Sequence, residues 1–228
     1  MPIRLNSTRV KEKSIRTLGG RPLFCWLLQE LDTLGIQTHV FCSQPRTLHA
    51  LLDFSTHHVH FTPRPARLDG DDVKGIEIYR AFANMVPAEV YLLTHCTSPF
   101  LSATSLRATL DPVVKGQRDS AMTVHSIQTF AWHRNKPLNF TLPRPITQSL
   151  EKIYVETSGA YCFTPHVLDQ GARTGSNPRF VEVDWPESED IDSETDFQRC
   201  QVVAKLLREP RPAETIFPGG EIVANAPT

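Results

Sequence analysis

The feature that most constrains the fold is an alternation of short apolar runs with amphipathic helical segments. Residues 23–31 repeat their hydrophobic side chains at helical spacing after Pro22, and Gly35 follows. Residues 90–93 form a continuous apolar run, as in strands that are buried on both faces. This alternation is typical of α/β proteins, in which ligands bind at the carboxyl ends of the strands. We therefore predict an α/β fold with a doubly wound, mostly parallel sheet.

Further segments continue the pattern. The predicted strands are 38–42, 58–61, 90–93, 119–124 and 154–163. The predicted helices, besides the first, are 46–53, a segment from Asp71 or Asp72 to Met85, 103–115 and 193–207, the last opened by a capping box of Ser193 and Asp196. Residues 126–150 break the pattern, and we expect a hairpin-like or irregular excursion there. Four prolines and Gly219-Gly220 predict a disordered tail over 208–228, so the folded domain should span 1–207.

Composition excludes several classes of function. The 228 residues carry a formal net charge of −1, so bulk charge gives no reason to expect nucleic-acid binding. No apolar run approaches the roughly 18 residues that a membrane helix needs. Five cysteines, none in Cys-x-x-Cys spacing, indicate reduced thiols in a cytoplasmic protein. We expect neither nucleic acid nor a membrane as a partner.

Local charge is strongly asymmetric. Residues 1–16 hold five basic side chains and one acidic one, whereas residues 182–196 hold eight acids and no base. Phosphoryl transfer needs both kinds, since cations bind the phosphates and carboxylates hold Mg²⁺. Asp190 and Asp192 would share one face of an extended backbone, which suits a single hard cation. Alternatively, the basic segment is a solvated terminus and the acids lie at the positive end of a helix dipole.

Four motifs, in order, resemble the CTP-dependent cytidylyltransferases that make CMP-activated sugar acids, typified by CMP-N-acylneuraminate synthetase. They are Pro2-Ile3-Arg4-Leu5-Asn6-Ser7-Thr8-Arg9 followed by Lys13-Ser14, then Arg64-Pro65-Ala66-Arg67-Leu68-Asp69-Gly70-Asp71, then Thr97-Ser98-Pro99, and finally Asp190-Ile191-Asp192-Ser193-Glu194-Thr195-Asp196-Phe197. The similarity spans about residues 2–207. It implies a nucleotide-diphospho-sugar transferase-like fold, and a reaction in which the hydroxyl of an acidic sugar attacks the α-phosphorus of CTP and expels pyrophosphate. It also implies a homodimer formed through residues 126–150.

The resemblance implies a role for each matching residue. The residues expected to bind CTP are Arg4, Ser7, Arg9, Lys13, Arg64 and Asp71, with Lys13 and Arg4 as the catalytic ones. The residues expected at the acidic acceptor are His95, Thr97, Ser98 and Gln148. Asp190 and Asp192 are expected to ligate Mg²⁺.

Four departures from the family pattern bear on these expectations. His95-Cys96 stands where Gln and Pro are usual, Ser14 replaces Asn, and Ser158-Gly159 replaces Asn-Gly. The acceptor therefore stays open between a sugar of sialic-acid type, a ketodeoxyoctonate and a non-sugar acid. Only three residues precede Arg4, where the family has a whole strand, so we expect a truncated first strand and a misplaced start. The rival hypothesis is a degenerate, non-catalytic nucleotide-binding module.

Overall fold

The computed structural model describes residues 1–5, 7 and 9–208. Except for Arg208, the predicted disordered tail lies outside these residues. The helices are α1 (Leu23–Thr33), α2 (Pro45–His49), α3 (Gly75–Met85), α4 (Ala103–Val114), α5 (Pro165–Asp169) and α6 (Glu194–Arg208), with short 3₁₀ turns η1 (Lys13–Ile15), η2 (Ala66–Asp69) and η3 (Thr147–Ser149). The strands are β1 (Thr17–Leu18), β2 (Arg21–Pro22), β3 (Thr38–Cys42), β4 (Val59–Pro63), β5 (Tyr91–Thr94), β6 (Ser120–Ile127), β7 (Trp132–His133), β8 (Lys136–Pro137), β9 (Ile153–Phe163) and β10 (Pro178–Glu182).

The main sheet has the strand order β10-β6-β9-β5. Strand β10 runs parallel to β6, whereas β9 runs antiparallel to both of its neighbours. A separate pair, β3 and β4, is parallel. The predicted α/β fold with parallel strands is thus confirmed, and β9 makes the main sheet mixed. None of the described helices is long and apolar enough to cross a membrane.

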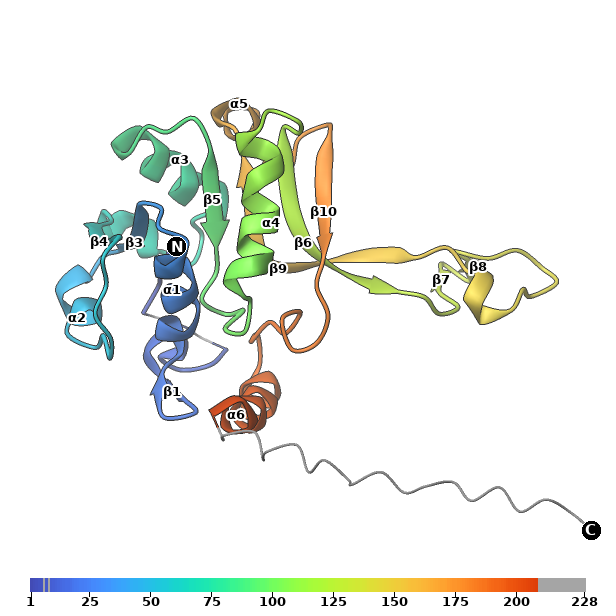
Figure 1. The fold of residues 1–228 in the computed structure, drawn as a ribbon, viewed down its shortest axis with the longest axis horizontal. Coiled ribbons are helices and arrows are strands. Elements are labelled where there is room, and N and C mark those ends of the chain that lie inside the picture. The colour runs from blue at the N-terminus through green and yellow to red at the C-terminus, as the bar shows by residue number, and fades with distance from the viewer. Residues whose placement is uncertain (6, 8, 209–228) are drawn as a thin grey trace, which may run out of the picture.

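Helices cover both faces of the main sheet, because adjacent residues of a strand point to opposite sides. In β9, Cys162 packs with Leu110 of α4, which lies across the sheet in Figure 1. The preceding residue, Tyr161, packs with Val167 of α5 on the other side. Two layers of helices around one sheet are what a doubly wound fold requires.

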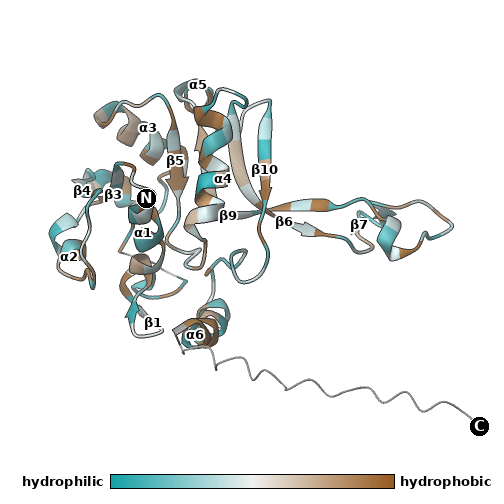
Figure 2. Cartoon of the chain, in the orientation of Figure 1, coloured by the Kyte–Doolittle hydropathy of each residue, from teal (hydrophilic) through white to brown (hydrophobic). Residues whose placement is uncertain are grey.

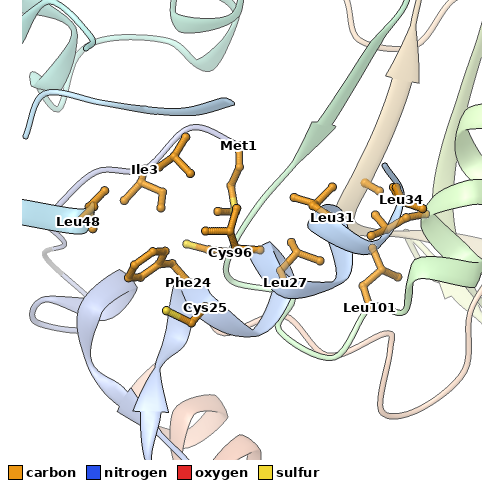
Figure 3. Packing of buried hydrophobic residues seen from close by; sticks show 14 of the residues in the cluster. Met1, Ile3, Phe24, Cys25, Leu27, Leu31, Leu34, Leu48, Cys96 and Leu101 are labelled. Atoms are coloured by element: carbon orange, nitrogen blue, oxygen red, sulfur yellow. The ribbon is translucent and has the colours of Figure 1, made fainter. Parts of the chain in front are cut away.

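Residues 1–3 lie along β3. Pro2 forms a parallel bridge to Phe41, and the backbone N–H of Ile3 donates to the Phe41 carbonyl at 3.0 Å. Figure 3 shows the Met1 side chain inside the apolar cluster, close to Cys96 and α1. Strands β3 and β5 do not pair with each other, and a cavity of about 320 Å³ lies between them. The segment ahead of the basic loop thus contributes a short stretch of pairing to β3.

Most predicted elements appear, with shifted ends. Strand β3 coincides with the prediction 38–42, whereas α2 is shorter than the predicted 46–53. Helix α3 begins at Gly75 rather than beside Asp71 or Asp72, because the N-cap is Lys74, whose backbone N–H bonds to the Glu77 side chain at 3.1 Å.

The capping box of α6 is present as predicted. The backbone N–H of Ser193 donates to Asp196 Oδ2 at 2.8 Å, and the N–H of Asp196 donates back to Ser193 Oγ at 3.2 Å. This reciprocal pairing gives hydrogen-bond acceptors to backbone N–H groups that would otherwise lack partners at the start of a helix. Helix α6 therefore begins within the acidic segment, directly after Ser193.

Residues 126–150 belong to an arm that projects from the body. Strands β6 and β9 continue into it as a two-stranded ribbon, and β7, β8 and η3 lie toward its far end (Figure 1). Rings of Phe130, Trp132 and Phe140 pack edge to face, and the Arg144 guanidinium lies over them. Hydrophobic and hydrophilic residues alternate along the arm in Figure 2. This is the hairpin-like excursion that the sequence predicted.

Candidate functional site

The basic N-terminal segment and the acidic segment meet at one place. The Nζ of Lys13 donates to the backbone carbonyl of Ile191 and lies 3.5 Å from Asp192 Oδ1. The guanidinium of Arg9 lies 3.2 Å from Asp192 Oδ2. The Lys13 side chain is only 12% exposed, so burial holds its charge in place beside the carboxylate.

Ile191 sets the position of the two aspartates. Its side chain is fully buried in a cluster with Phe197 of α6 and Leu23 of α1. Its backbone N–H donates to the Thr97 carbonyl at 2.9 Å, which attaches the acidic segment to the loop after β5. Because Ile191 points into the core, the carboxylates on either side of it are presented to the basic segment.

A second contact joins the basic segment to α6. The guanidinium of Arg16 donates to both carboxylate oxygens of Glu194, at 2.6 and 2.7 Å, and lies 4.0 Å from the centre of the Phe197 ring. The hydrogen bonds from Arg16 lower the pKa of Glu194 to about 2. The two ends of the folded domain are therefore fastened together beside the two aspartates.

Asp190 has the properties of a metal ligand. Its Oδ1 is buried with no hydrogen-bond partner among the described residues, and burial raises the pKa of the carboxyl above its ordinary value. The described residues contain no group of three or more histidine, cysteine or acidic side chains that could hold a metal ion. Mg²⁺ is usually held by one or two carboxylates together with substrate phosphates. Asp190 and Asp192 thus fit a divalent cation.

A cleft of about 320 Å³ lies at the carboxyl ends of β4 and β5, and its lining includes Arg4, Tyr79 and His95. The Arg4 guanidinium donates at 3.0 Å to the carbonyl of Val73, which also lines the cleft. Ser14, one of the departures from the family pattern, is buried and donates to the Arg4 carbonyl at 3.2 Å. Ser14 therefore holds the backbone of the basic loop in place.

Three other residues predicted to contact the nucleotide, Arg64, Asp71 and Ser7, lie in different surroundings. Arg64 lines the cleft, but it is buried, and its guanidinium is bonded to Asp69 and to the Phe41 carbonyl. Asp71 is exposed and is absent from the cleft lining. Ser7 is bonded through its backbone N–H to the Leu5 carbonyl at 3.1 Å. Their predicted roles stay predictions.

The residues predicted at the acceptor are not all brought together. His95 lines the cleft, Thr97 is half-buried beside the acidic segment, and Ser98 is fully buried against Gly159, where a Cβ would lie only 3.2 Å from the Ser98 side chain. Gln148 lies in η3 of the arm, is exposed, and is absent from the cleft lining.

His95 is held as a neutral imidazole. Its Nδ1 lies 2.7 Å from the Ser158 carbonyl and its Nε2 lies 3.2 Å from the Tyr79 hydroxyl. Burial lowers the pKa of His95 to about 4, so the ring is uncharged at neutral pH. Ser158 has a positive φ of 60°, a strained value for serine that aims its carbonyl at the ring.

Sequence reasoning missed Tyr79 as a residue of this region. It lay within a predicted helix without a functional role, yet its hydroxyl reaches His95. Ser158 was noted for its departure from the family pattern, and that signal did point to the site.

Comparisons with known proteins identify the family and the fold of the chain. The profile of the family described as Cytidylyltransferase matches residues 1–142. No curated protein matches the sequence. Among solved structures, the chain is similar to CMP:2-keto-3-deoxy-manno-octonic acid synthetase complexed with CTP, at 16% identity and a TM-score of 0.62 over 90% of this chain and 97% of that one.

Two further structures are similar in fold. One is 4-diphosphocytidyl-2C-methyl-D-erythritol synthase from Anaerococcus prevotii, at 12% identity and a TM-score of 0.59, over 85% of this chain and 91% of that one. The other is molybdopterin-guanine dinucleotide biosynthesis protein A from Archaeoglobus fulgidus, at 16% identity and a TM-score of 0.55, over 90% and 98%. At these identities the likeness shows a shared fold.

Proposed function

The chain belongs to the cytidylyltransferase family and is a nucleotidyltransferase, and from that premise we propose that it transfers CMP from CTP to an acidic sugar of sialic-acid type. The observation that carries the proposal is the meeting of Lys13 and Arg9 with Asp192. Cations that can bind a triphosphate and carboxylates that can bind its metal share one site, which phosphoryl transfer requires.

In the proposed reaction, a hydroxyl oxygen of the acceptor attacks the α-phosphorus of CTP, and the bond to pyrophosphate breaks. Lys13 and Arg4 neutralise charge on the phosphates, and the backbone of the basic loop orients them. Mg²⁺, held by Asp190 and Asp192, would supply further neutralisation of the phosphate oxygens. The neutral His95 would lie beside the acceptor without adding charge.

The acceptor stays open within one class. The fold neighbour with CTP is named for a ketodeoxyoctonic acid, so that sugar acid is the second candidate. Both are carboxylic acids with several hydroxyl groups, and His95 with Tyr79 presents a pair of polar groups in the cleft.

The test is to incubate the protein with CTP, Mg²⁺ and a panel of acids, and to measure released pyrophosphate. The panel comprises N-acetylneuraminate, ketodeoxyoctonate and a non-sugar α-keto acid. We expect turnover with a sugar acid and a loss of about 100-fold or more in kcat for Asp192→Asn. The matched control, Asp184→Asn, changes an exposed carboxylate of the same acidic segment and should keep wild-type activity. Binding of CTP without release of pyrophosphate for any acid would favour a non-catalytic module.

A further inference from the structure

Two residues of the cleft wall, Tyr79 and His95, form a hydrogen-bonded pair whose hydrogens can be assigned. The Ser158 carbonyl can only accept, so Nδ1 of His95 carries the hydrogen of that 2.7 Å bond. The Nε2 of the neutral ring is then an acceptor, and the Tyr79 hydroxyl donates to it at 3.2 Å. Both ring nitrogens of His95 are therefore engaged by groups of the chain itself.

The Tyr79 hydroxyl lies at the cleft itself, against Gly75. Gly75 is the first residue of α3, one helical turn before Tyr79, and it also lines the cleft. A Cβ at Gly75 would lie only 2.9 Å from the Tyr79 hydroxyl, so glycine leaves the space that the tyrosine side chain occupies. Alanine would favour the helix more than glycine does. The cleft therefore explains a glycine that the helix does not need.

The Tyr79 oxygen offers a ligand one kind of contact. Its hydrogen is used in the bond to His95, so toward a ligand the oxygen accepts and does not donate. Burial raises the pKa of Tyr79, although the charge of Arg173 opposes the rise, and the hydroxyl keeps its hydrogen at neutral pH. Glutamine, which is usual at the position of His95 in the family that the motifs resemble, carries both a donor and an acceptor. The pair of His95 and Tyr79 narrows this choice to an acceptor.

On the basis of the proposed function, we propose that the Tyr79 oxygen accepts a hydrogen bond from a hydroxyl group of the acceptor, and that His95 and Gly75 position Tyr79 for this contact. A hydroxyl group donates such a bond, whereas an ionised carboxylate or a fluorine atom has no hydrogen to donate. The carboxylate of the acceptor therefore lies elsewhere in the site. A sugar acid with several hydroxyl groups suits this wall of the cleft better than an acid without them.

The test uses the sugar acid that turns over best and a set of analogues, in each of which fluorine replaces one hydroxyl group remote from the reacting carbon. With the analogue that lacks the contacting hydroxyl, wild type should lose about 10-fold in kcat/KM, mainly through KM, as expected for one hydrogen bond. Tyr79→Phe should use this analogue and the parent acid alike within about two-fold. The matched control, Tyr91→Phe, removes a bonded tyrosine hydroxyl outside the cleft lining and should discriminate as wild type does.

Gly75→Ala tests the positioning of Tyr79. The added methyl group displaces the tyrosine side chain, so discrimination among the analogues should fall as in Tyr79→Phe although the hydroxyl is still present. The Tm should not fall, because alanine favours a helix more than glycine does, and this separates loss of the contact from loss of the fold. In the double variant Gly75→Ala/Tyr79→Phe, the two effects should not add. Wild-type discrimination by Gly75→Ala would overturn the positioning role of Gly75.

The hydrogen assignment has a readout of its own. Nitrogen NMR should show the His95 hydrogen on Nδ1 in wild type, and Tyr79→Phe should weaken that preference. A hydrogen on Nε2 in wild type, or a Tyr79→Phe variant that still rejects the same analogue, would overturn the inference and leave the proposed function intact. If wild type turns over no acid, calorimetry with N-acetylneuraminate and its fluorinated analogues decides. Binding that is weakened for one analogue in wild type but not in Tyr79→Phe supports the contact, and no binding by wild type overturns it together with the proposed function.

Discussion

Ser158 is a strained residue whose backbone serves the site. A left-handed conformation costs a residue with a Cβ roughly 1–2 kcal/mol, and here it lies beside a register shift between β6 and β9. The strain persists because the carbonyl that it redirects accepts the bond from His95. The site explains this strain better than folding does, since a residue with ordinary β-strand dihedral angles would fit the pairing of β6 and β9 better.

We predict that Ser158→Asn stabilises the protein, because asparagine adopts the left-handed region more readily than serine. The free energy of unfolding should rise by about 0.5–1 kcal/mol, which raises the Tm by roughly 1–4 °C for a chain of this size. Activity should stay within about two-fold, since the carbonyl is unchanged. Ser188→Asn, at a residue without positive φ, is the control and should bring no gain. A lower Tm for Ser158→Asn would refute the role of strain.

Asp190 gives a prediction about pH and metal. Burial raises its pKa in the folded state, so the folded protein loses stability from this group as pH rises through that pKa. Without metal, Asp190→Asn should therefore raise the Tm at pH 7, and the gain should vanish below the ordinary pKa of 3.8. Adding Mg²⁺ should raise the Tm of wild type and leave that of the variant unchanged, as calorimetry can measure. A variant that still responds fully to Mg²⁺ would rule out Asp190 as a ligand.

At the scale of elements, the hairpin of β1 and β2 fits against α6 through one glycine. Gly19 has a φ of +54°, and a Cβ there would lie 2.6 Å from the Cβ of Ala204. The hairpin also bonds to α6, since Gln201 donates to the Thr17 carbonyl at 2.7 Å. This contact keeps α6, and with it the acidic segment, against the start of the chain.

We predict that Gly19→Ala destabilises the protein by about 2 kcal/mol more than Gly116→Ala does. Both glycines have positive φ, but a Cβ at Gly116 meets nothing within 4 Å, so the comparison isolates the clash from the backbone strain. Thermal unfolding should show a difference in Tm of roughly 4–8 °C between the variants. Equal losses would mean that the backbone conformation, and not the contact with α6, requires glycine.

Elements with a strong local pattern were predictable from sequence. Strand β3 and helices α1 and α4 matched, because apolar periodicity and breakers such as Pro22 and Gly35 mark them. Helix α5 and strand β10 were missed: α5 has five residues, and most of β10 is exposed or half-buried, so neither carries a clear period. The start of α3 was misplaced since Lys74 is not a typical capping residue, whereas Asp71 and Asp72 are.

The residues of the candidate site were also predictable from the sequence only in part. The meeting of Lys13 with Asp192 was anticipated from two charge clusters and ordered motifs. The contact of Tyr79 was not, because it depends on which helix face lies next to His95 in space. Contacts between side chains distant in sequence leave no period or spacing that a single sequence could reveal.

At the scale of the molecule, the arm exposes several large apolar side chains. Leu138, Leu142 and Ile146 are 57%, 69% and 71% exposed. Fully burying such a side chain contributes about 1.5–3 kcal/mol of stabilisation. A single chain that exposes three of them lacks this hydrophobic stabilisation. Gln148, which the resemblance places at the acceptor, follows Ile146 closely in the sequence and does not line the cleft of its own chain. A second copy, reached by the arm, would account for both observations.

We therefore predict a homodimer through the arms, with twice the 25.7 kDa mass of the chain in light scattering. Replacing both Leu142 and Ile146 with Asp should give a folded monomer, because the two charges cannot be buried without partners. The control pair, Val202→Asp and Leu206→Asp, alters equally exposed residues of α6 and should leave the dimer intact. If the arm carries Gln148 into the partner's cleft, the monomer and Gln148→Ala should show the same rise in KM for the acceptor, with KM for CTP unchanged. A wild-type monomer, or a double variant that remains dimeric, would contradict the prediction.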